Sequence, residues 1–205
     1  MLVSESVDRS RKWVELPLLY QSLKSNFHRL RKLTDILNMD PTATCRKLED
    51  ISYGDAVYSV QREFMAIVRC FTEHSQRGQS ACSLAGLIYV ECCLRDVSPR
   101  SRIVCDLVDR LVDALSDMER EPRFQPEDEM PTHLLFWLLF IGAAAAEENT
   151  VVREKLMKWL AFLCRRLIHE PWTKTQETLK RISWVERGGR LFGAPLWEEL
   201  TRNHS

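Results

Sequence analysis

Glycine and proline are scarce in this sequence, with 7 and 8 residues respectively among 205. Their scarcity argues against an all-β fold, which needs many tight turns. The chain also lacks an excess of either charge, because 29 lysines and arginines balance 29 aspartates and glutamates. A surface built throughout to hold nucleic-acid phosphates should be basic, so zero net charge argues against that class of protein. The hydrophobic and charged fractions, 45% and 28%, are those of a soluble globular protein of one domain, or of one large domain with a small appendage.

The cysteines form no recognisable site. Their number is odd, the chain is too long for a disulfide scaffold, and no two are separated by the two residues typical of a zinc knuckle. Most lie among apolar residues at helical spacing, so we expect buried, reduced thiols in an intracellular protein. The seven residues are Cys45, Cys70, Cys82, Cys92, Cys93, Cys105 and Cys164.

Long hydrophobic segments are also scarce. The longest, Leu134–Ala146, has thirteen residues without a charge and is followed at once by Glu147 and Glu148. A membrane-spanning helix needs about 20 apolar residues, so this segment is expected to be a buried core helix. Met1–Ser10 has no apolar stretch of the length that a signal peptide requires.

Four leucines spaced seven apart, Leu16, Leu23, Leu30 and Leu37, indicate a helix with an apolar stripe. The stripe could be the seam of a coiled-coil dimer, but Thr34 interrupts it, which favours a helix packed on its own domain.

Two central segments have the pattern of buried helices. Ala81–Leu94 is apolar nearly all round, and its Gly86 costs helix stability unless a neighbour packs closely there. The Leu134–Ala146 helix carries Gly142 and a run of alanines, which suits close approach to another helix. His74–Ser80 has the composition of a loop.

Amphipathic helices are predicted along the rest of the chain. One begins at a Ser98-Pro99 cap and has an apolar face that includes Ile103 and Leu107. Others are expected over Val57–Phe71, from a cap at Asn149 or Thr150 to Leu167, from a capping box of Thr173 with Gln176 to Arg181, and over Leu196–Leu200. The predicted fold is therefore all-α, a bundle of seven or eight helices stacked as hairpins, with no sheet.

The balanced net charge hides two charged regions. Arg9–Lys32 contains seven lysines and arginines and one acid, whereas Cys105–Glu129 contains nine acids and three bases. These regions either face each other in the fold or each face a partner.

No catalytic motif is present. The sequence has no glycine-rich phosphate loop, no serine elbow flanked by glycines and no pair of histidines spaced to bind a metal on a helix. We therefore predict that the chain is not an enzyme and has no catalytic, cofactor-binding or metal-binding residues. The six tryptophans are expected to pack in the core, because four of them recur near apolar positions in the C-terminal third.

Three blocks resemble the fungal-specific transcription factor regulatory domain, which lies C-terminal to a binuclear zinc cluster in fungal regulators. Leu87–Leu115 is similar to a pair of helices joined at an arginine and proline turn. His133–Leu160 is similar to an apolar helix that runs into a glycine and alanine shoulder, and Thr173–Leu200 to a closing block that ends in Leu-Trp-Glu-Glu. The resemblance begins near Tyr53 and is less clear over residues 1–50.

This resemblance implies a helical, nuclear domain that regulates transcription, contacts partner proteins and does not itself read DNA. It divides the chain into an N-terminal helix and loop over residues 1–50 and a regulatory domain over residues 51–205. The cysteine-rich zinc cluster is absent from the sequence, because no cysteine precedes Cys45. We therefore expect a regulator's C-terminal part or a truncated relative, with other proteins as partners and no sequence-specific DNA binding.

Two alternatives stay open. The chain could be a stand-alone adaptor that forms a homodimer through the Leu16–Leu37 stripe. It could also sense a small molecule in a pocket between the helix around Leu87 and the Leu134–Ala146 helix.

Overall fold

Helices make up the fold of this computed structural model, which describes residues 18–39, 51–70, 77–120, 130–164, 171–186 and 193–202. Within these ranges there are eight α-helices, one π-helical turn and no strand, so the predicted all-α fold is confirmed. The elements are α1 (Leu18–Met39), α3 (Ile51–Cys70), α4 (Arg77–Tyr89), η4 (Val90–Leu94), α5 (Arg102–Glu119), α7 (Thr132–Ala145), α8 (Val151–Cys164), α9 (Trp172–Ile182) and α11 (Ala194–Arg202).

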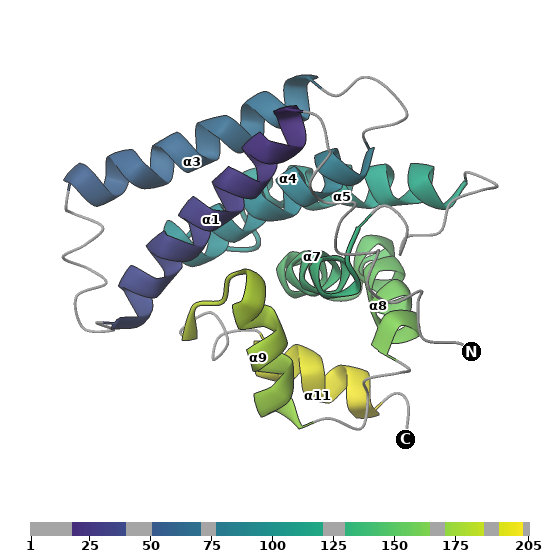
Figure 1. The fold of residues 1–205 in the computed structure, drawn as a ribbon. Coiled ribbons are helices and arrows are strands. Elements are labelled where there is room, and N and C mark those ends of the chain that lie inside the picture. Colours follow the sequence, from purple (N-terminus) through teal and green to yellow (C-terminus); the bar gives the residue numbers. More distant parts are fainter. Residues whose placement is uncertain are drawn as a thin grey trace, which may run out of the picture.

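The helices pack around α4 and α7 (Figure 1). The pair α1 and α3 lies on one side of α4, and α5 runs alongside α4. In the view of Figure 1, α7 is seen nearly end-on at the centre, with α8 beside it and α9 and α11 below. Helix α7 contacts α4, α5, α8 and α9, so it connects the upper and lower groups of helices.

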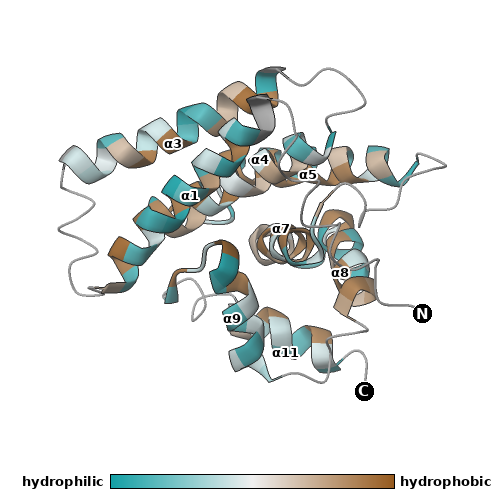
Figure 2. Cartoon of the chain, viewed as in Figure 1, coloured by the Kyte–Doolittle hydropathy of each residue, from teal (hydrophilic) through white to brown (hydrophobic). Residues whose placement is uncertain are grey.

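Both central helices are buried on every side, as their composition predicts. All residues from Ala81 to Leu94 and from Leu134 to Ala146 are buried. A helix that is apolar all round avoids water only in the middle of a protein. Figure 2 shows the contrast, because α7 is coloured as hydrophobic along most of its length whereas α1 and α3 alternate. Among the described helices, none combines the length and hydropathy of a membrane-spanning segment.

Glycine allows close approach at two places in this core. A Cβ atom at Gly86 would lie 2.6 Å from the Phe64 ring, and one at Gly142 would lie 2.8 Å from a methyl group of Leu111. Each glycine therefore lets a neighbouring helix pack directly against the backbone. The predicted close neighbour of Gly86 and the predicted close approach at Gly142 are both confirmed.

The leucine stripe belongs to the core of the chain itself. Leu23, Leu30 and Leu37 are all buried among residues of α1, α3 and the central helices, whereas Leu16 lies outside the described residues. The interpretation of the stripe as domain packing is confirmed for these three leucines, and they are not free to form a dimer seam.

Two helix starts, those of α4 and α5, differ from the predictions. Residues 77–80, expected to be loop, form the first turn of α4. Helix α5 is capped by Ser101, whose hydroxyl accepts a hydrogen bond from the Val104 amide at 3.3 Å. Ser98 instead accepts from the Arg100 amide in a local turn, so it and Pro99 precede the helix.

The predicted start of α9 and the predicted apolar face of α5 also differ from the structure. Pro171 occupies the N-cap of α9, so Thr173 lies inside the helix and makes no capping box with Gln176. On α5, Leu107 is half-buried and Ile103 is 61% exposed, so neither is fully in the core. After α7, Thr150 is the capping residue, because its hydroxyl accepts from the Arg153 amide. Asn149 instead adopts a left-handed backbone with φ of 61°.

Candidate functional site

A buried polar cluster joins α1 to the segment that follows α9. The Thr34 hydroxyl lies 3.1 Å from the Tyr89 hydroxyl and 2.6 Å from the Ser183 hydroxyl, and it also donates to the Leu30 carbonyl. The Trp137 indole N–H donates to the Ser183 carbonyl at 2.7 Å. Because each of these polar atoms has a partner, the cluster specifies one register between four elements. Its place in the core indicates a structural role.

Asn38 adds a second connection between the same two segments. Its side-chain N–H donates to the Trp184 carbonyl at 2.9 Å, and its side-chain oxygen accepts from the Glu186 amide at 3.0 Å. Beneath it, the rings of Phe140, Trp172 and Trp184 pack in stacked and edge-on pairs. The prediction that tryptophans pack in the core is confirmed for Trp137, Trp184 and Trp197, which are buried.

The charged side chain of Glu91 is buried inside the π-helical turn η4. It is only 2% exposed, yet it accepts a hydrogen bond from the Gln61 side chain at 2.6 Å and pairs with Arg95 at 3.0 Å. A buried carboxylate requires such partners because water no longer solvates it. Next to this pair is a cavity of about 350 Å³. Its lining residues are Tyr53, Gly54, Val57, Tyr58, Gln61, Leu94 and Arg95.

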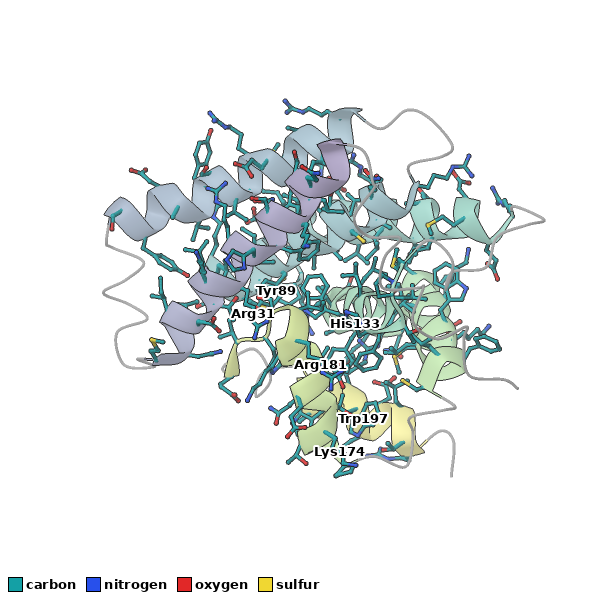
Figure 3. The ribbon with its side chains drawn as sticks, viewed as in Figure 1. Arg31, Tyr89, His133, Lys174, Arg181 and Trp197 are labelled. Carbon is teal, nitrogen blue, oxygen red and sulfur yellow. The ribbon has the colours of Figure 1, made fainter. Side chains whose placement is uncertain are left out.

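Two arginines and a histidine lie close together near the start of α7 and the end of α9. The Arg31 guanidinium donates to the Arg181 carbonyl at 3.3 Å, and Figure 3 shows Arg31 beside α1 and Arg181 beside α9. Partial burial, together with the charge of Arg181, lowers the pKa of His133. On α1, the exposed face continues with Lys24, His28 and Lys32. Over its described part the predicted basic region is an exposed face except at Arg29, which is half-buried and pairs with Glu63 on α3, while Arg9, Arg11 and Lys12 lie outside the described residues.

The outer face of α5 carries the opposite charge. Asp106, Asp109 and Asp113 are all exposed there, Arg110 is exposed among them, and the exposed Ile103 lies near the start of the helix beside the exposed Arg102. The described part of the predicted acidic region is thus on the surface. The rest of that region, residues 121–129, lies outside the described residues. We call Ile103, Asp106, Asp109 and Asp113 the acidic face of α5.

The described cysteines are free thiols. Cys82, Cys92, Cys93 and Cys164 are buried, as expected, and Cys105 is half-buried. Burial raises the pKa of the Cys82, Cys92 and Cys164 thiols to about 12, so they are protonated and unreactive at neutral pH. Cys45 and the side chain of Cys70 lie outside the described part of the structure. In the described part of the chain, no group of three or more metal-binding side chains comes together.

Comparison with known proteins identifies the family of this helical arrangement. The model of the fungal-specific transcription factor domain matches residues 14–193. The chain belongs to this family. The match includes α1, which lies in the part of the sequence where the resemblance was less clear. No curated protein and no solved structure matches the chain.

Sequence reasoning missed the polar residues that organise this domain. Nothing in the sequence singled out Glu91, because it lies within the apolar segment Ala81–Leu94. Arg95 nevertheless follows it at the i+4 spacing of a helical ion pair. Thr34 was read as an interruption of a leucine stripe, and its partners Tyr89 and Ser183 are distant in sequence. The sequence predicted a pocket between the helix around Leu87 and α7, whereas the cavity described above lies between α3 and η4.

Proposed function

We propose that this chain is a non-catalytic regulatory domain of a fungal transcription regulator, that it works in the nucleus, and that it acts by binding other proteins. The observation that carries this proposal is the family match over residues 14–193, which gives a regulatory role in transcription. The family is one of transcription regulators. The buried polar side chains around Thr34 and Glu91 hydrogen-bond to one another, which indicates a structural role for them.

The distribution of surface charge supports protein partners. The exposed face of α1 is basic, whereas the acidic face of α5 carries three carboxylates and an exposed isoleucine, with the single cation of Arg110 among the carboxylates. A DNA-binding surface attracts phosphates, which the acidic face would repel. A protein with a basic and partly apolar segment complements that face, because carboxylates steer its approach and Ile103 gives apolar contact.

A reporter assay tests the regulatory role directly. The chain is fused to an unrelated DNA-binding module, and transcription from a promoter that carries the module's site is measured. We expect the fusion to change transcription relative to the module alone, and we expect the triple variant Asp106→Asn, Asp109→Asn, Asp113→Asn to lose most of that change. The matched control is Glu147→Gln, Glu148→Gln, Glu154→Gln, which also removes three exposed charges. Equal effects of the two triple variants would contradict a role for the acidic face.

Binding to DNA is tested separately. Fluorescence anisotropy of the isolated chain with duplexes of varied sequence, at about 0.15 M salt, should show weak binding that falls steeply with added salt and does not depend on sequence. Tight binding to one sequence would overturn the proposal that this chain leaves DNA reading to another module.

Homodimerisation remains a prediction, but the leucine stripe of α1 cannot be the dimer interface. Since Leu23, Leu30 and Leu37 are buried in the chain's own core, a dimer of the folded chain would have to use another surface. Analytical ultracentrifugation of the intact chain measures whether a dimer forms.

A further inference from the structure

The cavity beside η4 is lined by apolar and aromatic residues and by one charged residue, Arg95. Among its lining residues, Val57, Leu94 and Tyr53 are buried. Tyr58, by contrast, is 62% exposed at the edge. A volume of about 350 Å³ lies within the range of pockets that hold small organic molecules, and such pockets combine an apolar lining with a few fixed polar groups.

Arg95 supplies the fixed polar group. Its Nη1 atom donates to both carboxylate oxygens of Glu91, at 3.0 and 3.2 Å, and lies 3.4 Å from the Gln61 side-chain oxygen. Within the described part of the chain, its Nε and Nη2 atoms make no hydrogen bond, and half of the side chain is exposed. Glu91 and Gln61 therefore hold the guanidinium from one side and leave two parallel N–H donors for a ligand. That arrangement matches the two oxygens of a carboxylate.

Gly54 lies in the wall of the cavity, and packing does not explain it. A Cβ atom there would meet nothing within 4 Å, whereas one at Gly86 or Gly142 would meet a neighbouring side chain. A glycine inside a helix costs stability relative to alanine. At Gly54 this cost has no compensating helix contact in the structure, and the exposed residue lines the cavity.

The backbone around Glu91 and Arg95 is irregular. Residues Val90–Leu94 form a π-helical turn at the end of the buried helix α4, and Asp96 follows with a left-handed φ of 58°. Single π-helical turns occur often at functional sites, because the extra residue redirects side chains. Here the turn accompanies a buried carboxylate and an arginine at the cavity wall.

We propose that this cavity binds a small organic acid, whose carboxylate pairs with the free edge of Arg95 and whose apolar body lies on Val57 and Leu94. Glu91 accepts from Nη1 alone, so it leaves the Nε and Nη2 edge of the guanidinium to the ligand. The nearby carboxylates of Asp55 and Asp96 are exposed, so water and salt screen them. This inference goes beyond the proposed function and does not depend on which protein the domain binds.

Benzoate is a suitable probe, with benzamide as its uncharged isostere. Each is titrated into the ¹⁵N-labelled intact chain, and amide chemical shifts are followed. We expect saturable shifts with benzoate at residues 53–61 and 94–95, with a dissociation constant on the order of 1 mM, and binding of benzamide at least fivefold weaker. Absence of saturable shifts with benzoate, or equal binding of the two probes, would overturn the proposal.

Three variants test the geometry without removing the charge of Arg95. Gly54→Leu fills the open space and should weaken benzoate binding at least tenfold, whereas Gly54→Ala should change it less than threefold. Arg95→Lys keeps the pair with Glu91 but loses the planar pair of donors, and it should weaken binding about fivefold. Folding of each variant is checked by its amide spectrum. If a folded Gly54→Leu variant bound benzoate as the unaltered chain does, the ligand would lie elsewhere and the proposal would fail.

Discussion

The hydroxyl of Thr34 lies 2.6 Å from the hydroxyl of Ser183, although 149 positions separate the two residues in the sequence. This contact connects the first described helix to the segment that follows α9. The same Thr34 hydroxyl contacts Tyr89, and the Ser183 carbonyl accepts from Trp137. One small hydroxyl therefore takes part in fixing four elements.

Replacing Thr34 with valine should destabilise the domain. The change preserves shape but leaves the buried hydroxyls of Tyr89 and Ser183 short of one partner, which costs about 1–3 kcal/mol. Urea denaturation followed by circular dichroism measures the difference. Thr178→Val is the matched control, because the Thr178 hydroxyl contacts only its own helix near the surface. The control should stay within about 0.5 kcal/mol of the unaltered chain, and equal losses for the two variants would contradict the role given to Thr34.

Truncating Trp137 should cost much more than truncating Leu107. Trp137 is fully buried, packs edge-on against Phe27 and donates to a buried carbonyl. We expect Trp137→Ala to lose about 3–5 kcal/mol. Leu107→Ala should lose less than 2 kcal/mol, roughly, because its side chain is only half-buried and its removal leaves little cavity. Denaturant midpoints give both values, and a larger loss at Leu107 would mean that the face of α5 is packed differently.

Alanine should have opposite effects at two helical glycines. At Gly142 a new Cβ would come within 2.8 Å of Leu111 and 3.3 Å of Leu156, and the resulting overpacking costs about 1–3 kcal/mol. At Gly54 the new Cβ meets nothing, so Gly54→Ala should stabilise the domain by up to about 1 kcal/mol. Thermal denaturation of the two variants side by side measures the signs. Destabilisation at Gly54 would indicate a packing role that the structure lacks.

The buried thiols should make the domain less stable at high pH. Burial raises the pKa of Cys82 and Cys164 to about 12 from an ordinary value of 9.0, so the folded state holds these protons longer than the unfolded chain does. Stability is therefore unaffected by these groups at neutral pH and falls as the pH rises from about 9 towards 12. Urea midpoints at pH 7.5 and 9.5 compare the two regimes. In the double variant Cys82→Ala, Cys164→Ala, the loss of stability between pH 7.5 and 9.5 should be smaller. An unchanged loss would show that other groups cause it.

The fold was predictable where one helix carries its own signal. The apolar segments Ala81–Leu94 and Leu134–Ala146 indicated central helices, and Gly86 indicated a close neighbour. The predicted helix cap at Ser98 was wrong, because Ser101, three residues later, caps α5 instead. Composition also misassigned residues 77–80, where packing of α4 on α5 overrides the loop-forming tendency of glycine and serine.

The candidate site was largely invisible to the sequence. The lining of the cavity comes from α3 and from η4 and its following residue, which are brought together only by tertiary packing. The i+4 spacing of Glu91 and Arg95 was the one local signal, but it does not reveal that Gln61 completes the arrangement. Nor does periodicity reveal a π-helical turn, since the apolar residues of Val90–Leu94 are buried on every side.

The hydrogen bonds of Thr34 and Asn38 to the 183–186 segment bear on how this domain can be divided. A recombinant fragment that starts at residue 51 would lack α1 and would uncover Trp137, Tyr89 and the Ser183 backbone at once. Such a fragment should be poorly soluble, and adding a peptide of residues 18–39 in trans should rescue it. We therefore expect the smallest autonomous folding unit to include α1.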